Sequence, residues 1–148
     1  MWTWTSPAHH WFSSVNISSF DDLLRASREQ PEPQRLLFVF AAAVLPDDST
    51  TEQRARFQAG QGGALTPLMS VDKTTDELGT FAALVEESLQ FERDWTIVFV
   101  AGLSGRGGRA PSSEEADQCL QRMIESIKTG SIGGFIAFDR RGALMLLT

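Results

Sequence analysis

The segment with the clearest potential for chemistry is a loop rich in glycine and arginine at residues 102–110. It follows an apolar run typical of a buried strand and precedes a Ser-Ser-Glu-Glu sequence typical of a helix N-terminus. Glycine lets the backbone approach a phosphate closely, amides at a helix start attract anions, and arginine pairs with phosphate or carboxylate groups. The sequence therefore predicts an anion-binding set made of Gly105, Arg106, Gly107, Gly108 and Arg109.

Three features of the same loop favour interpretations without an anion. It matches neither of the common glycine motifs that bind phosphate, and it contains no lysine. Glu114 and Glu115 follow it and would repel an anion from the positive end of the helix. A surface connection with no ligand, or a loop that contacts another protein, would use the same residue types.

The remaining nucleophiles and metal ligands are placed poorly for catalysis. His9 and His10 are the two histidines, and adjacent residues in an N-terminal segment hold a catalytic base badly. Cys119 is the single cysteine, which excludes an intrachain disulfide and a metal site of several cysteines. Neighbouring carboxylates would raise its pKa, as expected for a half-buried structural thiol. We expect no catalytic residue, no metal and no cofactor.

Charge and composition exclude further classes of function. The net charge of −6 repels nucleic-acid backbones, and the arginines are scattered along the chain. No apolar run approaches the roughly 20 residues that a membrane-spanning helix needs. A single cysteine suits a reducing compartment. We therefore expect a soluble cytoplasmic protein that binds neither nucleic acid nor membranes.

The first residues differ from the rest of the chain. Residues 1–14 contain no Asp, Glu, Lys or Arg, but three of the four tryptophans. Three interpretations stay open: a disordered tail over 1–15, a native translation start at Val15, or an aromatic segment that packs on the domain or on a partner.

Residues 16–148 carry the signals of one α/β domain. Capping sequences and helical spacing predict helices, and continuous apolar runs predict strands buried on both faces, as in parallel sheets. The expected order is α-β-α-α-β-α-β-β, with helices over 19–29, 50–59, 74–89 and 112–129 and strands over 35–44, 95–101, 135–138 and 143–147. Because helices separate the strands, we expect parallel crossovers in a four-stranded mixed sheet that ends in a β-hairpin. Residues 60–74 form the longest irregular stretch of this prediction.

The last predicted strand, Ala143 to Leu147, is apolar without alternation. At the edge of a sheet it would expose backbone groups and apolar side chains, which invites pairing with another chain. The alternative is that a helix or the N-terminal tail covers it. A homodimer or a protein partner is therefore expected in the first case.

Several longer segments resemble a group of small proteobacterial proteins that carry the label ribonucleotide reductase subunit alpha. The resemblance covers residues 16–142 and includes the segments GGALTPLMSVDKT, SGRGGRAPS and IKTGSIGGFIAFDRRG. The reductase activity itself would require a radical cysteine and a redox-active cysteine pair. Since this chain has one cysteine, it cannot perform that reaction on its own.

Two hypotheses about function follow. The first is a non-catalytic domain that associates with itself or binds another protein, because the residues form no catalytic set. The alternative is a protein that binds, or acts on, an anionic metabolite or nucleotide through the loop at 102–110. A response of residues 102–113 to phosphate, ATP or dNTPs would separate the two.

Overall fold

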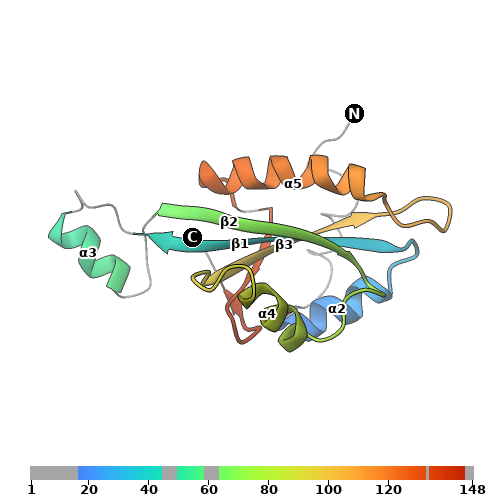
Figure 1. Cartoon of the computed structure of the whole chain (residues 1–148), viewed down its shortest axis with the longest axis horizontal. Coiled ribbons are helices and arrows are strands. Elements are labelled where there is room, and N and C mark those ends of the chain that lie inside the picture. The colour runs from blue at the N-terminus through green and yellow to red at the C-terminus, as the bar shows by residue number, and fades with distance from the viewer. Residues whose placement is uncertain (1–16, 45–49, 59–63, 133, 146–148) are drawn as a thin grey trace.

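A five-stranded sheet with helices on both faces forms the body of the protein (Figure 1). The computed structural model describes residues 17–44, 50–58, 64–132 and 134–145. The strands are β1 (Gln34–Val44), β2 (Ala64–Thr74), β3 (Ile97–Ser104), β4 (Ile136–Phe138) and β5 (Leu144–Met145). They lie in the order β2-β1-β3-β4-β5, and each pair of neighbours is antiparallel.

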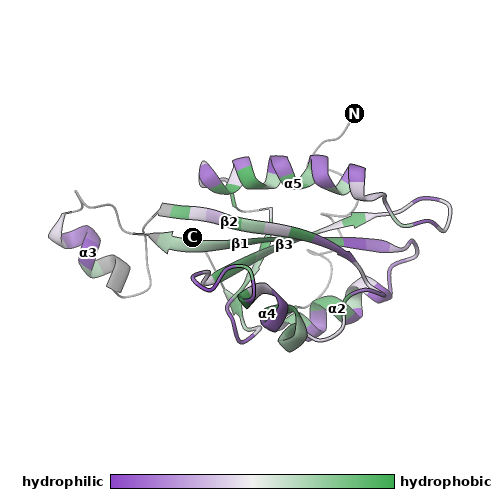
Figure 2. Ribbon diagram, viewed as in Figure 1, coloured by the Kyte–Doolittle hydropathy of each residue, from purple (hydrophilic) through white to green (hydrophobic). Residues whose placement is uncertain are grey.

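The helices are divided between the two faces of the sheet. They are α2 (Phe20–Arg28), α3 (Thr51–Gln58), α4 (Phe81–Leu89) and α5 (Ser113–Lys128). Figure 1 shows α5 on one face of the sheet and α2 with α4 on the other. The outward side of α5 is hydrophilic, whereas the central strands are largely hydrophobic (Figure 2). The molecule therefore has three layers, with two apolar cores separated by the sheet.

Strand β1 contributes to both cores, which explains its uninterrupted apolar sequence. Leu36, Phe38 and Phe40 pack with α2 and α4, whereas Leu37, Val39 and Ala41 pack with α5. Successive side chains of a strand point to opposite faces, so both sets must be apolar when helices cover both faces. The prediction of strands buried on both faces is confirmed.

The predicted strand directions and strand number were wrong. The sheet is antiparallel with five strands, and the element order of the described residues is α-β-α-β-α-β-α-β-β in place of α-β-α-α-β-α-β-β with four strands. Burial on both faces does not by itself require parallel pairing, because helices can cover both faces of an antiparallel sheet too. Helix α4 does join two strands that run in the same direction, β2 and β3, but β1 lies between them. The α/β class and the C-terminal hairpin are confirmed.

Strand β2 occupies most of the stretch that was predicted to be irregular, residues 60–74. The glycines that precede the strand, at positions 60, 62 and 63, and Pro67 within it obscured the strand pattern. Proline is tolerated in a strand at the edge of a sheet, and β2 pairs only with β1 among the described residues. An extra residue, Leu68, also bulges out where Phe40 pairs with Met69 and Ala41 with Pro67. A bulge interrupts the period of two that would otherwise have marked the strand.

The capping sequence at Thr74 forms, but the helix does not start there. Thr74 Oγ1 accepts a hydrogen bond from Glu77 N at 3.3 Å, and Thr74 N donates to Glu77 Oε1 at 2.9 Å. This pair closes a single turn, after which Thr80 caps α4 by accepting from Ala83 N at 3.1 Å. The prediction of a helix from 74 was therefore wrong by about two turns.

Glu77→Gln tests the electrostatic part of this turn. Hydrogen bonds from Thr74 hold the pKa of the Glu77 carboxyl below its ordinary value, with a smaller contribution from Arg35. A lowered pKa adds stability above the pKa of the unfolded chain, and this stability disappears as the pH falls through the lower folded value. We expect the variant to be less stable than the wild type at pH 7 and the difference to shrink as the pH is lowered from 7 to 3. Urea unfolding at both pH values measures it, and a difference that is independent of pH would contradict the prediction.

The remaining predicted elements agree in part with the structure. The helix expected over 50–59 is α3, which Figure 1 places beyond the ends of β1 and β2. The N-terminal segment 1–15 and both histidines lie outside the described residues. No helix in the described part of the chain is long and apolar enough to cross a bilayer.

Candidate functional site

The glycine–arginine loop is a closed, tight turn. Arg106 N donates to Arg109 O at 2.9 Å, and Arg109 N donates back to Arg106 O at 3.0 Å. Gly107 and Gly108 between them have φ angles of 59° and 80°. Positive φ at both central residues is the requirement of a type I′ turn, which glycine satisfies without a steric cost. The glycines are therefore explained by the turn itself.

The backbone amides that were predicted to cradle an anion mostly have acceptors within the chain. Gly105 N donates to Pro33 O at 2.8 Å, and Gly108 N donates to the carboxylate oxygen Glu32 Oε2 at 3.0 Å. Gly105 is buried, whereas Arg106, Gly107, Gly108 and Arg109 are exposed. The structure thus brings the five predicted residues together in one turn. The carboxylate of Glu32, from the same chain, already accepts the hydrogen bond of one amide in this turn, that of Gly108.

The surroundings of this turn do not resemble a ligand site of an open parallel sheet. In an antiparallel sheet the strand ends alternate in direction, so the crevice that parallel strands form at their carboxyl ends is absent here. Helix α5 begins after Ser112, whose Oγ accepts from Glu115 N at 3.2 Å. The first turn of α5 carries Glu114 and Glu115, as the sequence indicated. Binding of an anion by this loop stays a prediction with no supporting contact.

Cys119 lies on the inner face of α5 with an exposed fraction of 5%. Burial raises the pKa of its thiol; Arg122 opposes this effect and Glu115 reinforces it. A thiol that is buried and neutral is a poor nucleophile. The predicted structural role fits this environment, although Cys119 is more deeply buried than expected.

We predict that Cys119 of the folded protein reacts slowly with a thiol reagent such as DTNB at pH 8. The reaction requires an opening of α5, because the sulfur is buried and the thiolate is disfavoured. Labelling in 6 M guanidinium chloride gives the control rate of the unfolded chain. Comparable rates in the two conditions would contradict the prediction.

The described part of the C-terminal strand lies at an edge of the sheet, but its outer side is occupied, and Leu146 and Leu147 of the predicted strand lie outside the described residues. Leu144 N donates to Ser18 O at 3.3 Å, and Phe20 N donates to Gly142 O at 3.0 Å. Ser19 and Ala143 form an isolated antiparallel bridge. Of the two alternatives for this strand, the covered one holds for residues 142–144, with the start of α2 as the cover.

The opposite edge of the sheet carries no further strand in the described part of the chain. Strand β2 pairs with β1 along its length, and none of the described residues pairs with its other side. Its backbone groups on that side are a template for a further strand. Five residues at one end, from Met69 to Lys73, form the part of this edge that lacks Pro67 and the bulge at Leu68. We call residues 69–73 the open half of β2.

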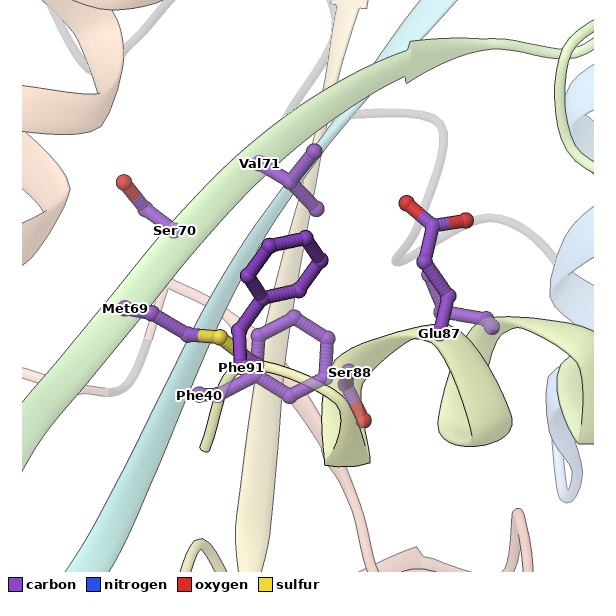
Figure 3. Close-up of a pocket in the computed structure, with 8 residues that line it drawn as sticks. Phe40, Met69, Ser70, Val71, Glu87, Ser88 and Phe91 are labelled. Carbon is purple, nitrogen blue, oxygen red and sulfur yellow. The ribbon is translucent and has the colours of Figure 1, made fainter. Parts of the chain in front are cut away.

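A mostly apolar cavity lies beside the open half of β2. It has a volume of about 380 Å³ and is lined by Phe40, Met69, Ser70, Val71, Leu84, Glu87, Ser88 and Phe91. Figure 3 shows these side chains coming from β1, β2 and the end of α4. Phe91 is the one large apolar side chain that is strongly exposed among the described residues, at 78%. We call this region the β2–α4 groove.

Two polar side chains of the groove, Ser88 and Glu87, are bonded within the chain. Ser88 Oγ donates to Val85 O at 2.6 Å and accepts from Trp95 Nε1 at 2.9 Å. Glu87 pairs with Lys73 at 3.2 Å. In the described residues, no group of three or more His, Cys, Asp or Glu side chains could hold a metal ion. The groove therefore offers apolar contact and a free strand edge.

Comparison of the chain with protein-family models, curated proteins and solved structures found no match. The groove was also missed in the sequence, since β2 was predicted to be irregular. One signal was available: Met69 and Val71 alternate with Ser70 and Asp72, the period expected for a strand with one apolar face.

Proposed function

We propose that this protein is a protein-interaction domain that binds an extended polypeptide segment along the open half of β2. The observation that carries the proposal is the juxtaposition of an unpaired strand edge with an apolar cavity. Proteins that bind extended segments use this combination: the strand edge supplies hydrogen bonds, and pockets beside it receive alternate side chains of the segment.

The side chains of the open half match this mode of binding. Met69 and Val71 face the α4 side, where they pack on the same core as Phe40 and Phe38. A strand added to β2 would place every second side chain on that face, toward Phe91 and the groove. Burial of Phe91 would remove a large exposed apolar side chain from water and stabilise the complex.

The charged side chains of the open half, Asp72 and Lys73, do not prevent another strand from pairing with it. Natural sheets often protect an edge with charged side chains. Here Asp72 forms an ion pair with Arg35 at 2.6 Å, and Lys73 forms one with Glu87 at 3.2 Å. Both charges are compensated inside the chain, which supports the use of this edge for binding.

A library of displayed 12-residue peptides tests the proposal with purified protein as the bait. We expect the selected peptides to alternate apolar and polar residues and to lose at least about tenfold in affinity when Phe91→Asp is introduced, the equivalent of about 1.4 kcal/mol. Ala82→Asp places the same charge on an exposed position of α4 outside the groove and should leave affinity unchanged. Peptides whose affinity is indifferent to Phe91, or dependent on Arg106 and Arg109, would overturn it.

A further inference from the structure

We infer that the strand which occupies the open half of β2 is β2 of a second copy of this chain, related by a two-fold axis that passes through Val71. This inference rests on the proposed function and names its partner. Two antiparallel edge strands can join two sheets into one continuous sheet, and a two-fold axis makes the same patch serve on both copies.

The position of the axis follows from which residues can pair. Pro67 has no amide hydrogen, and Leu68 is the extra residue of the bulge, so neither fits a regular ladder. An axis through Ser70 would place Lys73 opposite the partner's Pro67 and Asp72 opposite the partner's Leu68. An axis closer to Leu68 would use still more of the irregular half.

Like charges exclude the axes at the other end. An axis through Asp72 would place it opposite the partner's Asp72, and an axis through Lys73 would do the same with two ammonium groups. Like charges directly opposite each other destabilise a strand pair. An axis through Val71 places Met69 opposite the partner's Lys73 and Ser70 opposite the partner's Asp72. Among the axes through residues 69–73, the axis through Val71 is the one that places no like charges opposite each other and pairs residues of the open half only.

The same axis places the β2–α4 grooves of the two copies next to each other. It is perpendicular to the joined sheet, so both copies of α4 lie on one face of it. Because Lys73 contacts Glu87 and Met69 lines the cavity with Phe91, the two α4 helices run antiparallel across the joint. Phe91 of each copy then lies at the end of its groove that meets the partner's Lys73, whose aliphatic stem can cover an aromatic ring. Apolar surface on both copies is buried by one contact.

Cysteine cross-linking tests this register in the full-length chain with Cys119→Ala as the background, which leaves one thiol. Directly opposed residues of an antiparallel pair have Cβ atoms about 5 Å apart, close to the range of a disulfide. We expect Val71→Cys to form a covalent dimer under mild oxidation. Ser70→Cys, one residue away, would lie opposite the partner's Asp72 and should form no covalent dimer, and neither should Thr66→Cys in the irregular half.

Light scattering of the wild type and of Val71→Glu completes the test. We expect a dimer at concentrations of tens of micromolar that dissociates when Val71→Glu places two carboxylates at the axis, whereas Thr66→Glu leaves it intact. A monomer that still binds displayed peptides through Phe91 would overturn the second copy as partner and leave the proposed function standing. A dimer in which Ser70→Cys cross-links in preference to Val71→Cys would overturn the register. A monomer that also binds no peptide through Phe91 would overturn both.

Discussion

Trp95→Ala is expected to lower the free energy of unfolding by about 3–5 kcal/mol, the range for removing a buried aromatic side chain. Trp95 is fully buried in the segment that leads into β3. Its ring meets Phe40 edge-on, with a distance of 4.9 Å between centroids, and its Nε1 donates to Ser88 Oγ at 2.9 Å. The substitution removes these contacts and leaves a cavity between the sheet and α4.

Arg140, in the turn between β4 and β5, packs against Trp95. Its guanidinium carbon lies 5.2 Å from the Trp95 ring centroid, and its Nε donates to Trp95 O at 2.7 Å. The same side chain also bonds Arg93 O. The β4–β5 turn is thereby fastened to the segment that leads into β3, so loss of the ring should also loosen the C-terminal hairpin.

Urea unfolding followed by far-UV circular dichroism measures the loss of stability in Trp95→Ala. Phe91→Ala is the matched control at protein concentrations low enough to keep the chain monomeric, because Phe91 is an aromatic residue four positions earlier that is 78% exposed in the single chain. A surface substitution of this kind usually changes stability by less than about 0.5 kcal/mol. Equal effects of the two substitutions would contradict the burial described for Trp95.

Gly105→Ala is expected to destabilise the protein by about 3 kcal/mol, because it forces a side chain into a space filled by backbone. A Cβ atom at this position would lie 1.9 Å from Arg109 O and 2.9 Å from Pro33 O. Neither oxygen belongs to a flexible side chain that could move aside. The turn at Arg106–Arg109, or its attachment to the start of β1, must therefore open.

Gly79→Ala is the control for Gly105→Ala. A Cβ atom at Gly79 would have no neighbour within 4 Å. Its replacement should leave stability unchanged or raise it by about 0.4–1 kcal/mol through a smaller entropy of the unfolded chain. Thermal and urea unfolding of both variants would decide the matter, and a neutral Gly105→Ala would contradict the close packing of the loop against Pro33.

The sequence predicted the elements that depend on local signals. Ser19 and Ser112 cap α2 and α5 as their spacing indicated, and the apolar runs of β1 and β3 are strands. The hairpin at the C-terminus also formed as expected, with its turn at Gly142, whose φ of 82° suits glycine. These features are decided by a few neighbouring residues, so a single sequence carries enough information about them.

Strand order and the groove could not be predicted in the same way. The direction of β3 relative to β1 is set by pairing between residues more than fifty positions apart, such as Phe38 and Val100. The groove depends on β2, whose strand pattern is broken by Pro67 and the bulge. The role of the glycine loop likewise depended on Glu32, a distant residue whose carboxylate meets Gly108. Each of these outcomes requires a long-range contact that local patterns do not encode.

The bridge between Ser19 and Ala143 has a consequence for how the chain folds during synthesis. These residues are separated by most of the described chain, so the bridge cannot form until Ala143 has left the ribosome. Contacts between distant residues also slow folding, because a long loop must close before they contribute. Until β5 has been synthesised, β4 has no partner on this side, so this edge of the sheet closes only after the other strands have been made.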